Sequence, residues 1–127
     1  MNATAAADEV ADLRHQRRDL RRELARVKWW RRLVAARRDL TLASLTAPDT
    51  IAQDATESAW VALAADAPTA LELTSAVWPD VHDVSLADLD ALDALDGRLD
   101  RYERRLSATL DSVTAHMVEA MGKVHRA

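Results

Sequence analysis

Hydrophobic residues recur at alternating steps of three and four over residues 8–46, the pattern of an amphipathic helix with a narrow packing seam. Seven of the eleven seam positions are apolar. The eleven are Val10, Leu13, Arg17, Leu20, Leu24, Val27, Arg31, Val34, Arg38, Thr41 and Leu45. Trp30, Leu33 and Leu40 widen the apolar face beside this seam. We therefore predict one long helix over residues 8–46.

The same alternation returns over residues 85–123, where we predict a second long helix. Its seam positions are Leu92, Leu95, Leu99, Tyr102, Leu106, Leu110, Val113, Met117, Ala120 and Val124. At its start the Ser85 hydroxyl can accept a hydrogen bond from a first-turn amide, and Asp88 suits the positive end of the helix dipole. Gly122, followed by basic residues, predicts where the helix ends.

The connection between the two arms, residues 47–84, holds all three prolines of the chain. It is too long to be structureless in a compact domain. We expect one or two short helices in it, the first running through Trp60 and the second opened by Pro68 and closed by Pro79. Trp60 and Trp78 are expected to fold these helices back onto the long arms.

Two arms of similar length predict an all-α fold: an antiparallel two-helix coiled-coil hairpin with one or two short helices in the long connection. We assign residues 1–127 to a single domain. Composition agrees with this fold, because alanine and leucine supply most of the apolar residues and Ile51 is the only isoleucine.

Charge is strongly polarised along the chain. Residues 14–38 carry eleven Arg or Lys against two acids, whereas residues 41–100 carry twelve acids against one Arg. If the arms run antiparallel, facing positions add up to about 131 and place opposite charges together. The expected pairs are Lys28 with Glu103, Arg31 with Asp100, Arg38 with Asp93, and Arg21 or Arg22 with Asp111. Pairing between the arms is the main expected use of the basic face; a protein partner, nucleic acid or a membrane surface are the alternatives.

Nothing in the residue pattern indicates an enzyme, a cofactor or a metal site. The chain has no cysteine, its four histidines lack metal-ligand spacing, and two glycines cannot build a phosphate-binding loop. No serine has a histidine and an acid at a recognisable spacing. With no secretory start and no apolar stretch long enough for a membrane, we expect a cytoplasmic protein that does not bind membranes.

Two segments resemble a known family. Residues 28–40 read KWWRRLVAARRDL and residues 99–107 read LDRYERRLS. They are similar to the two helices of the RsiG-type anti-sigma factors, also called aerial mycelium formation proteins, of high-GC actinobacteria. In that family each of two antiparallel helices carries Glu, three residues, Ser, two residues, Arg, three residues, Gln, three residues and Asp. The two copies bind a cyclic di-GMP dimer, and the protein then holds a sporulation sigma factor of the WhiG type.

The motif is retained here at four of its ten positions: Arg31 and Asp39 in the first copy, Glu103 and Ser107 in the second. Lys28 stands at a serine position and can meet a phosphate as a point charge. The resemblance thus implies a divergent member of the family. If a cyclic di-GMP site exists, its expected residues are Lys28, Arg31, Asp39, Glu103 and Ser107.

Taken together, these patterns predict a non-enzymatic helical interaction protein that binds a protein partner, as the resemblance implies for a sigma factor. The residues expected to contact the partner are Trp29, Trp30, Arg32, Arg37 and Arg38. The alternatives are a cyclic dinucleotide sensor, a nucleic-acid-binding protein that uses the basic first helix, and a homodimer in which two wide apolar faces meet.

Overall fold

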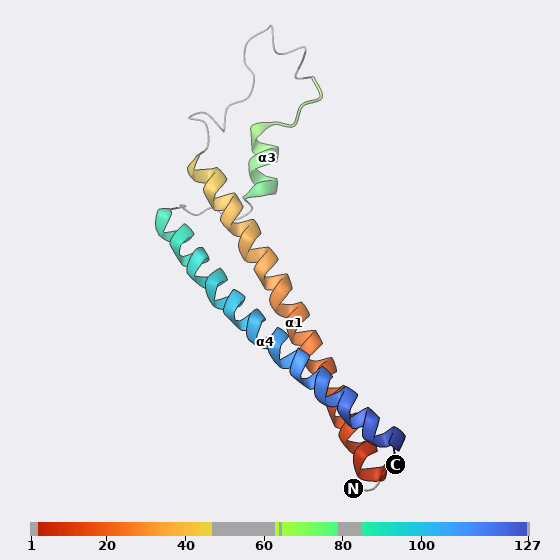
Figure 1. The fold of residues 1–127 in the computed structure, drawn as a ribbon. Helices are drawn as coiled ribbons and strands as arrows, with labels where there is room; N and C mark the ends of the chain where they lie inside the picture. Colours follow the sequence, from red (N-terminus) through yellow and green to blue (C-terminus); the bar gives the residue numbers. More distant parts are fainter. Residues whose placement is uncertain (1–2, 47–62, 64, 79–84, 127) are drawn as a thin grey trace.

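The structure, a computed structural model, describes residues 3–46, 63, 65–78 and 85–126, and most of these residues are helical. In these residues there are three helices and no strand, which confirms the all-α prediction. They are α1 (Ala3–Leu45), α3 (Ala70–Val77) and α4 (Leu86–Arg126) (Figure 1). α3 occupies the place of the second predicted short helix. The first, through Trp60, lies outside the described residues.

Each long helix extends beyond its predicted range at the end nearer the chain terminus. α1 begins at Ala3, before residue 8, since the N-terminal alanines are good helix formers and Ala6 is buried. α4 passes its predicted end at residue 123 and continues to Arg126. Ala120 is buried beside this end and Met121 to Val124 are half-buried, so packing offsets the helix-weakening effect of one glycine.

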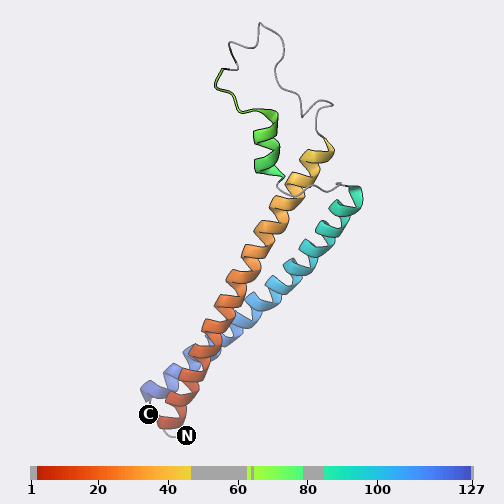
Figure 2. The same ribbon diagram turned by 180° about the vertical axis from the view of Figure 1, so that it is seen from behind.

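α1 and α4 pack along their length and run in opposite directions. Side-chain contacts join Arg17 to Thr114, Arg31 to Asp100 and Arg38 to Asp93, so residue numbers rise along α1 as they fall along α4. The two numbers of each pair add up to 131, the predicted register. Both termini lie at one end of the pair, and in both views the helices cross towards that end (Figures 1 and 2).

The interface between the long helices consists mainly of small and branched apolar side chains. The buried residues are Ala6, Val10, Val27, Val34 and Thr41 on α1, and Leu106, Val113, Met117 and Ala120 on α4. The seam predicted for α4 is wrong at Leu95, which is 42% exposed; the next residue, Asp96, contacts α1 instead. Asp96 precedes the seam residues Leu110 and Met117 by multiples of seven, so it occupies the same heptad position. A search for apolar residues alone does not find it, because it is an acid.

Capping hydrogen bonds fix the starts of the two later helices. At α3, Thr69 and Glu72 form a complete capping box: the Glu72 amide donates to Thr69 Oγ1 at 3.1 Å, and the Thr69 amide donates to Glu72 Oε1 at 3.4 Å. At α4 the Ser85 amide donates to Asp88 Oδ2 at 2.8 Å. The Ser85 hydroxyl also donates to that carboxylate, so it does not play the predicted acceptor role.

α3 buries none of its own residues, and its leucines are exposed. α3 itself therefore does not cover the long helices, as was expected of this part of the connector. None of the helices described in the structure is long and apolar enough to cross a membrane.

Candidate functional site

The most highly connected side chain between the long helices is Arg31 of α1. Its Nε and Nη2 donate to the two carboxylate oxygens of Asp96 at 3.0 and 3.3 Å. Its Nη1 donates to Asp100 Oδ1 at 3.2 Å and to Glu103 Oε2 at 2.7 Å. Asp96, Asp100 and Glu103 follow one another at spacings of four and three, so they share one face of α4 and form a hole that receives the guanidinium. These four residues are named the Arg31 cluster below.

The Arg31 cluster is only partly shielded from water, since the side chains of Arg31 and Glu103 are 28% and 19% exposed. The hydrogen bonds to Asp96 and then to Glu103 raise the pKa of Arg31 above its ordinary value. Arg104 adds a second cation by pairing with Asp100 at 3.1 Å. Two positive charges therefore face three negative ones, and Arg31 is held by this chain's own acids.

A second ion pair lies two turns further along α1, where Arg38 Nε donates to Asp93 Oδ1 at 2.5 Å. This hydrogen bond raises the pKa of Arg38. Both partners are largely exposed, so the pair orients the helices more than it stabilises them.

The predicted pairings around these two arginines are wrong in part. Glu103 is bonded by Arg31, which occupies the seam, and Lys28 stands outside it. Among the described residues, neither Arg21 nor Arg22 forms an ion pair with Asp111, because none of the three lies on the seam.

Three of the five residues expected at a cyclic di-GMP site border one groove. Lys28, Arg31 and Glu103 line it together with Arg32 and Ala25, and its volume is about 520 Å³.

The remaining two expected ligand residues are not joined to that groove. Asp39 is exposed two turns beyond Arg31, and Ser107 is half-buried one turn beyond Glu103. Within the described residues the side chains of Asp39 and Ser107 form no ion pair or hydrogen bond.

Two tryptophans predicted to contact a partner lie together on the outer side of α1. Trp29 and Trp30 meet edge to face with ring centroids 4.8 Å apart, and they are 46% and 43% exposed. Leu33, one turn further on, is also exposed. We name Trp29, Trp30 and Leu33 the tryptophan face.

The three arginines predicted to act with the tryptophans have different environments. Arg32 is exposed and borders the groove beside Lys28, and Arg37 is half-buried. Arg38 is bonded to Asp93 of α4. The structure therefore does not gather the five predicted partner residues on one face.

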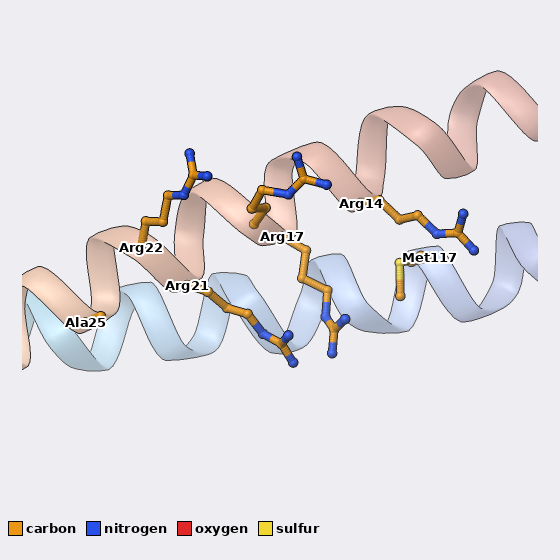
Figure 3. A pocket seen from close by; sticks show the side chains of 7 residues that line it. Arg14, Arg17, Arg21, Arg22, Ala25 and Met117 are labelled. Carbon is orange, nitrogen blue, oxygen red and sulfur yellow. The ribbon is translucent and has the colours of Figure 1, made fainter.

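A second hollow, away from the residues predicted for a ligand site, lies nearer the termini. Its volume is about 490 Å³. It is lined by Arg14, Arg17, Arg18, Arg21, Arg22, Ala25 and Met117. Figure 3 shows the arginine side chains extending from α1 and the side chain of Met117 extending from α4 beside them. We name it the arginine hollow.

Two sequence signals could have located these features. Asp96, Glu103, Leu110 and Met117 follow one another at intervals of seven residues. Because the last two are apolar seam residues, the two acids also lie on the seam, opposite Arg31. The arginine hollow could have been found from the i, i+3, i+4 and i+7 spacing of Arg14, Arg17, Arg18 and Arg21.

The described side chains offer no group of three or more His, Asp or Glu that could hold a metal ion. No protein-family model, no curated protein and no solved structure matches this chain.

Proposed function

We propose that this chain is a non-enzymatic interaction protein that binds a protein partner through the tryptophan face of α1. The observation that supports this proposal is the pair of adjacent, half-exposed tryptophans on the side of α1 that α4 leaves uncovered. Tryptophan is the residue most enriched among those that dominate binding energy at protein interfaces.

Packing gives α1 two distinct sides. Val27 and Val34 are buried on the side facing α4, so the interface between the helices is complete without the tryptophans. At about 100° per residue, Trp29 points away from these two valines, whereas Trp30 lies only about 50° from them, at the edge of the interface with α4. Their mutual contact limits the rotamers each ring can take, which lowers the entropy lost on binding a partner.

The expected partner surface is an apolar groove or helix face with acidic residues at its rim, because basic residues flank the tryptophans on α1. The narrower proposal follows from the family resemblance: the partner is a sigma factor of the WhiG type, and α1 with α4 acts as a coiled-coil hairpin that presents the tryptophan face.

Calorimetric titration of the full chain with the WhiG-type sigma factor of the same organism tests the narrower proposal. We expect a stoichiometric complex that Trp29→Ala with Trp30→Ala weakens by at least about 2 kcal/mol, the loss typical of interface residues that dominate binding. Val118→Ala is the matched control, since Val118 is 61% exposed on α4.

Circular dichroism must show that the double variant retains its helices. A sigma factor that binds the variant and the native chain equally would exclude the tryptophan face as its contact. If the native chain itself gives no heat, the partner is not this sigma factor.

The groove beside Lys28 and Arg32 supports a second candidate function, the sensing of a cyclic dinucleotide. A ligand phosphate there would meet Lys28 and Arg32 without displacing the acids that hold Arg31. Calorimetry with cyclic di-GMP decides this: we expect binding that Lys28→Ala with Arg32→Ala weakens, and no heat at high micromolar ligand would remove the candidate.

A further inference from the structure

The arginine hollow is part of a longer basic surface. The hollow and the groove beside Lys28 share Ala25 as a lining residue, so the two are continuous along α1. Together they form a stripe about 27 Å long, at 1.5 Å of rise per residue. Its members are Arg14, Arg17, Arg18, Arg21, Arg22, Lys28 and Arg32. We name these seven residues the basic stripe.

The cations of the basic stripe are not neutralised by the acids of this chain that the structure describes. None of the seven forms an ion pair there, and only Arg17 donates a hydrogen bond across the helices, to the neutral Thr114 Oγ1 at 3.2 Å. The acids of α4 that could reach α1 are bonded to Arg31 and Arg38, which are outside the stripe.

Within the span of the stripe, residues 14–32, the two acids of α1 lie on a different side of the helix. These are Asp19 and Glu23, which at about 100° per residue point away from most cations of the basic stripe. Glu23 is bonded to Arg26, which is not a member of the stripe. Apart from Glu103, which borders the groove and is bonded to Arg31, the stripe is therefore a surface of one sign on which like charges repel one another unless an anion covers it.

The chemistry of the stripe favours a phosphate backbone over an acidic protein. Protein interfaces have an apolar centre, whereas the arginine hollow offers only Ala25 and Met117 among five arginines. Six of the seven cations are arginines, whose planar guanidinium donates two parallel hydrogen bonds to a phosphate. An extended row of such donors matches a ligand that carries charge at regular intervals.

We propose that the basic stripe is a binding surface for the phosphate backbone of nucleic acid. Its seven cations supply contacts to phosphates, which bind nucleic acid without regard to base sequence. The stripe and the tryptophan face use different side chains of α1, so this surface does not depend on the protein partner.

Fluorescence anisotropy with the full chain and labelled oligonucleotides of about 16 nucleotides, single-stranded and duplex, tests the assignment. We expect binding at about 50 mM salt that weakens steeply towards 200 mM, because bound counterions are released. Arg18→Gln with Arg21→Gln and Arg22→Gln should reduce the affinity at least about tenfold. The slope of the logarithm of affinity against the logarithm of salt should flatten by about 0.9 per arginine for the duplex.

The matched control removes the same charge from α4 through Arg98→Gln, Arg101→Gln and Arg126→Gln, all exposed and outside the stripe. It should retain most of the affinity, and circular dichroism should show both triple variants helical. Equal losses in the two triple variants would reduce the effect to net charge and overturn the assignment, as would absence of binding by the native chain at low salt. Displacement of the oligonucleotide by polyglutamate as readily as by unlabelled oligonucleotide would show an acidic protein ligand and overturn it too.

Discussion

The two halves of the paired helices are held together by different forces. In the half nearer the termini, residues 3–27 of α1 pack against residues 106–126 of α4, and all four buried residues of α4 lie there. In the other half, residues 31–45 face residues 86–103, where only Val34 and Thr41 are buried and the contacts across the helices include the Arg31 cluster and the pair of Arg38 with Asp93. We call these the apolar half and the charged half.

The difference shows how stability and register are divided between the halves. Burying apolar surface stabilises by about 25 cal/mol per Å² and is insensitive to which small side chain faces which. Exposed ion pairs contribute about 0 to 1 kcal/mol each but require particular partners. The apolar half therefore supplies most of the stability, and the charged half selects one alignment of the helices.

The strongest test of this division is Leu106→Ala, in the apolar half. Leu106 is 8% exposed, and removing its side chain should lower the free energy of unfolding by about 3 kcal/mol, as expected for a buried leucine. Urea unfolding followed by circular dichroism measures the loss. Leu95→Ala in the charged half is the control and should cost less than about 0.5 kcal/mol because Leu95 is largely exposed. Equal losses would contradict the division.

A smaller effect is expected from Arg31→Met. This change leaves Asp96, Asp100 and Glu103 facing an apolar side chain, and the three carboxylates then repel one another. We expect a loss of about 1 to 2 kcal/mol, in the lower part of the range for charged hydrogen bonds because the cluster is partly solvated.

The origin of that loss can be separated from simple side-chain removal. Arg32→Met, which alters an exposed residue without an ion pair in the described structure, should be nearly neutral. Adding Asp96→Asn and Asp100→Asn to Arg31→Met should recover part of the stability. No recovery would show that repulsion among the carboxylates is not the cause.

One glycine in each half permits a matched comparison of the two. A methyl group at Gly97 would meet the tip of Arg101 at 3.6 Å, and one at Gly122 the tip of Arg126 at 3.4 Å, both on flexible side chains. Gly97→Ala and Gly122→Ala should each stabilise by about 0.5 to 1 kcal/mol, since alanine is the better helix former. Equal gains in urea unfolding would show that the halves unfold together, and a gain confined to Gly122→Ala would show that the charged half opens first.

The smallest expected effect is a pH dependence from the exposed pair of Glu23 and Arg26. Their hydrogen bond lowers the pKa of Glu23 from its ordinary value of 4.5. The stabilisation is therefore present above pH 4.5 and is lost as the pH falls through the lower folded-state value. The free energy of unfolding should change slightly less between neutral and acid pH for Glu23→Gln than for the native chain, as measured by urea unfolding at both pH values. A larger pH dependence in the variant would reverse the sign and contradict the assignment.

Much of the fold could be predicted because helix periodicity and charge complementarity point the same way. The spacing of Val27 and Val34 fixes the face of α1 that is buried, and the polarised charges give the register that joins Arg31 to Asp100. The seam of α4 was misplaced at Leu95 because apolar pattern alone cannot reveal that an acid, Asp96, is the better neighbour of a seam arginine.

The candidate sites were harder to predict than the fold. Arg31 was expected to pair with Asp100 and also to line any cyclic di-GMP site, but a guanidinium between helices bonds whatever acids surround it, and here there are three. The spacing of the arginines indicates that they share one side of α1, but the sequence also shows abundant acids, and only the geometry shows that these acids lie out of reach of Arg18 and Arg21.

The hole that receives Arg31 also limits how the length of this protein can change. Inserting seven residues into α1 ahead of Arg31 would preserve its apolar stripe, since seven is the repeat of the seam. It would nevertheless carry Arg38 opposite Leu86 and away from Asp93. Natural relatives with longer arms are therefore expected to have grown by whole heptads in both arms at once.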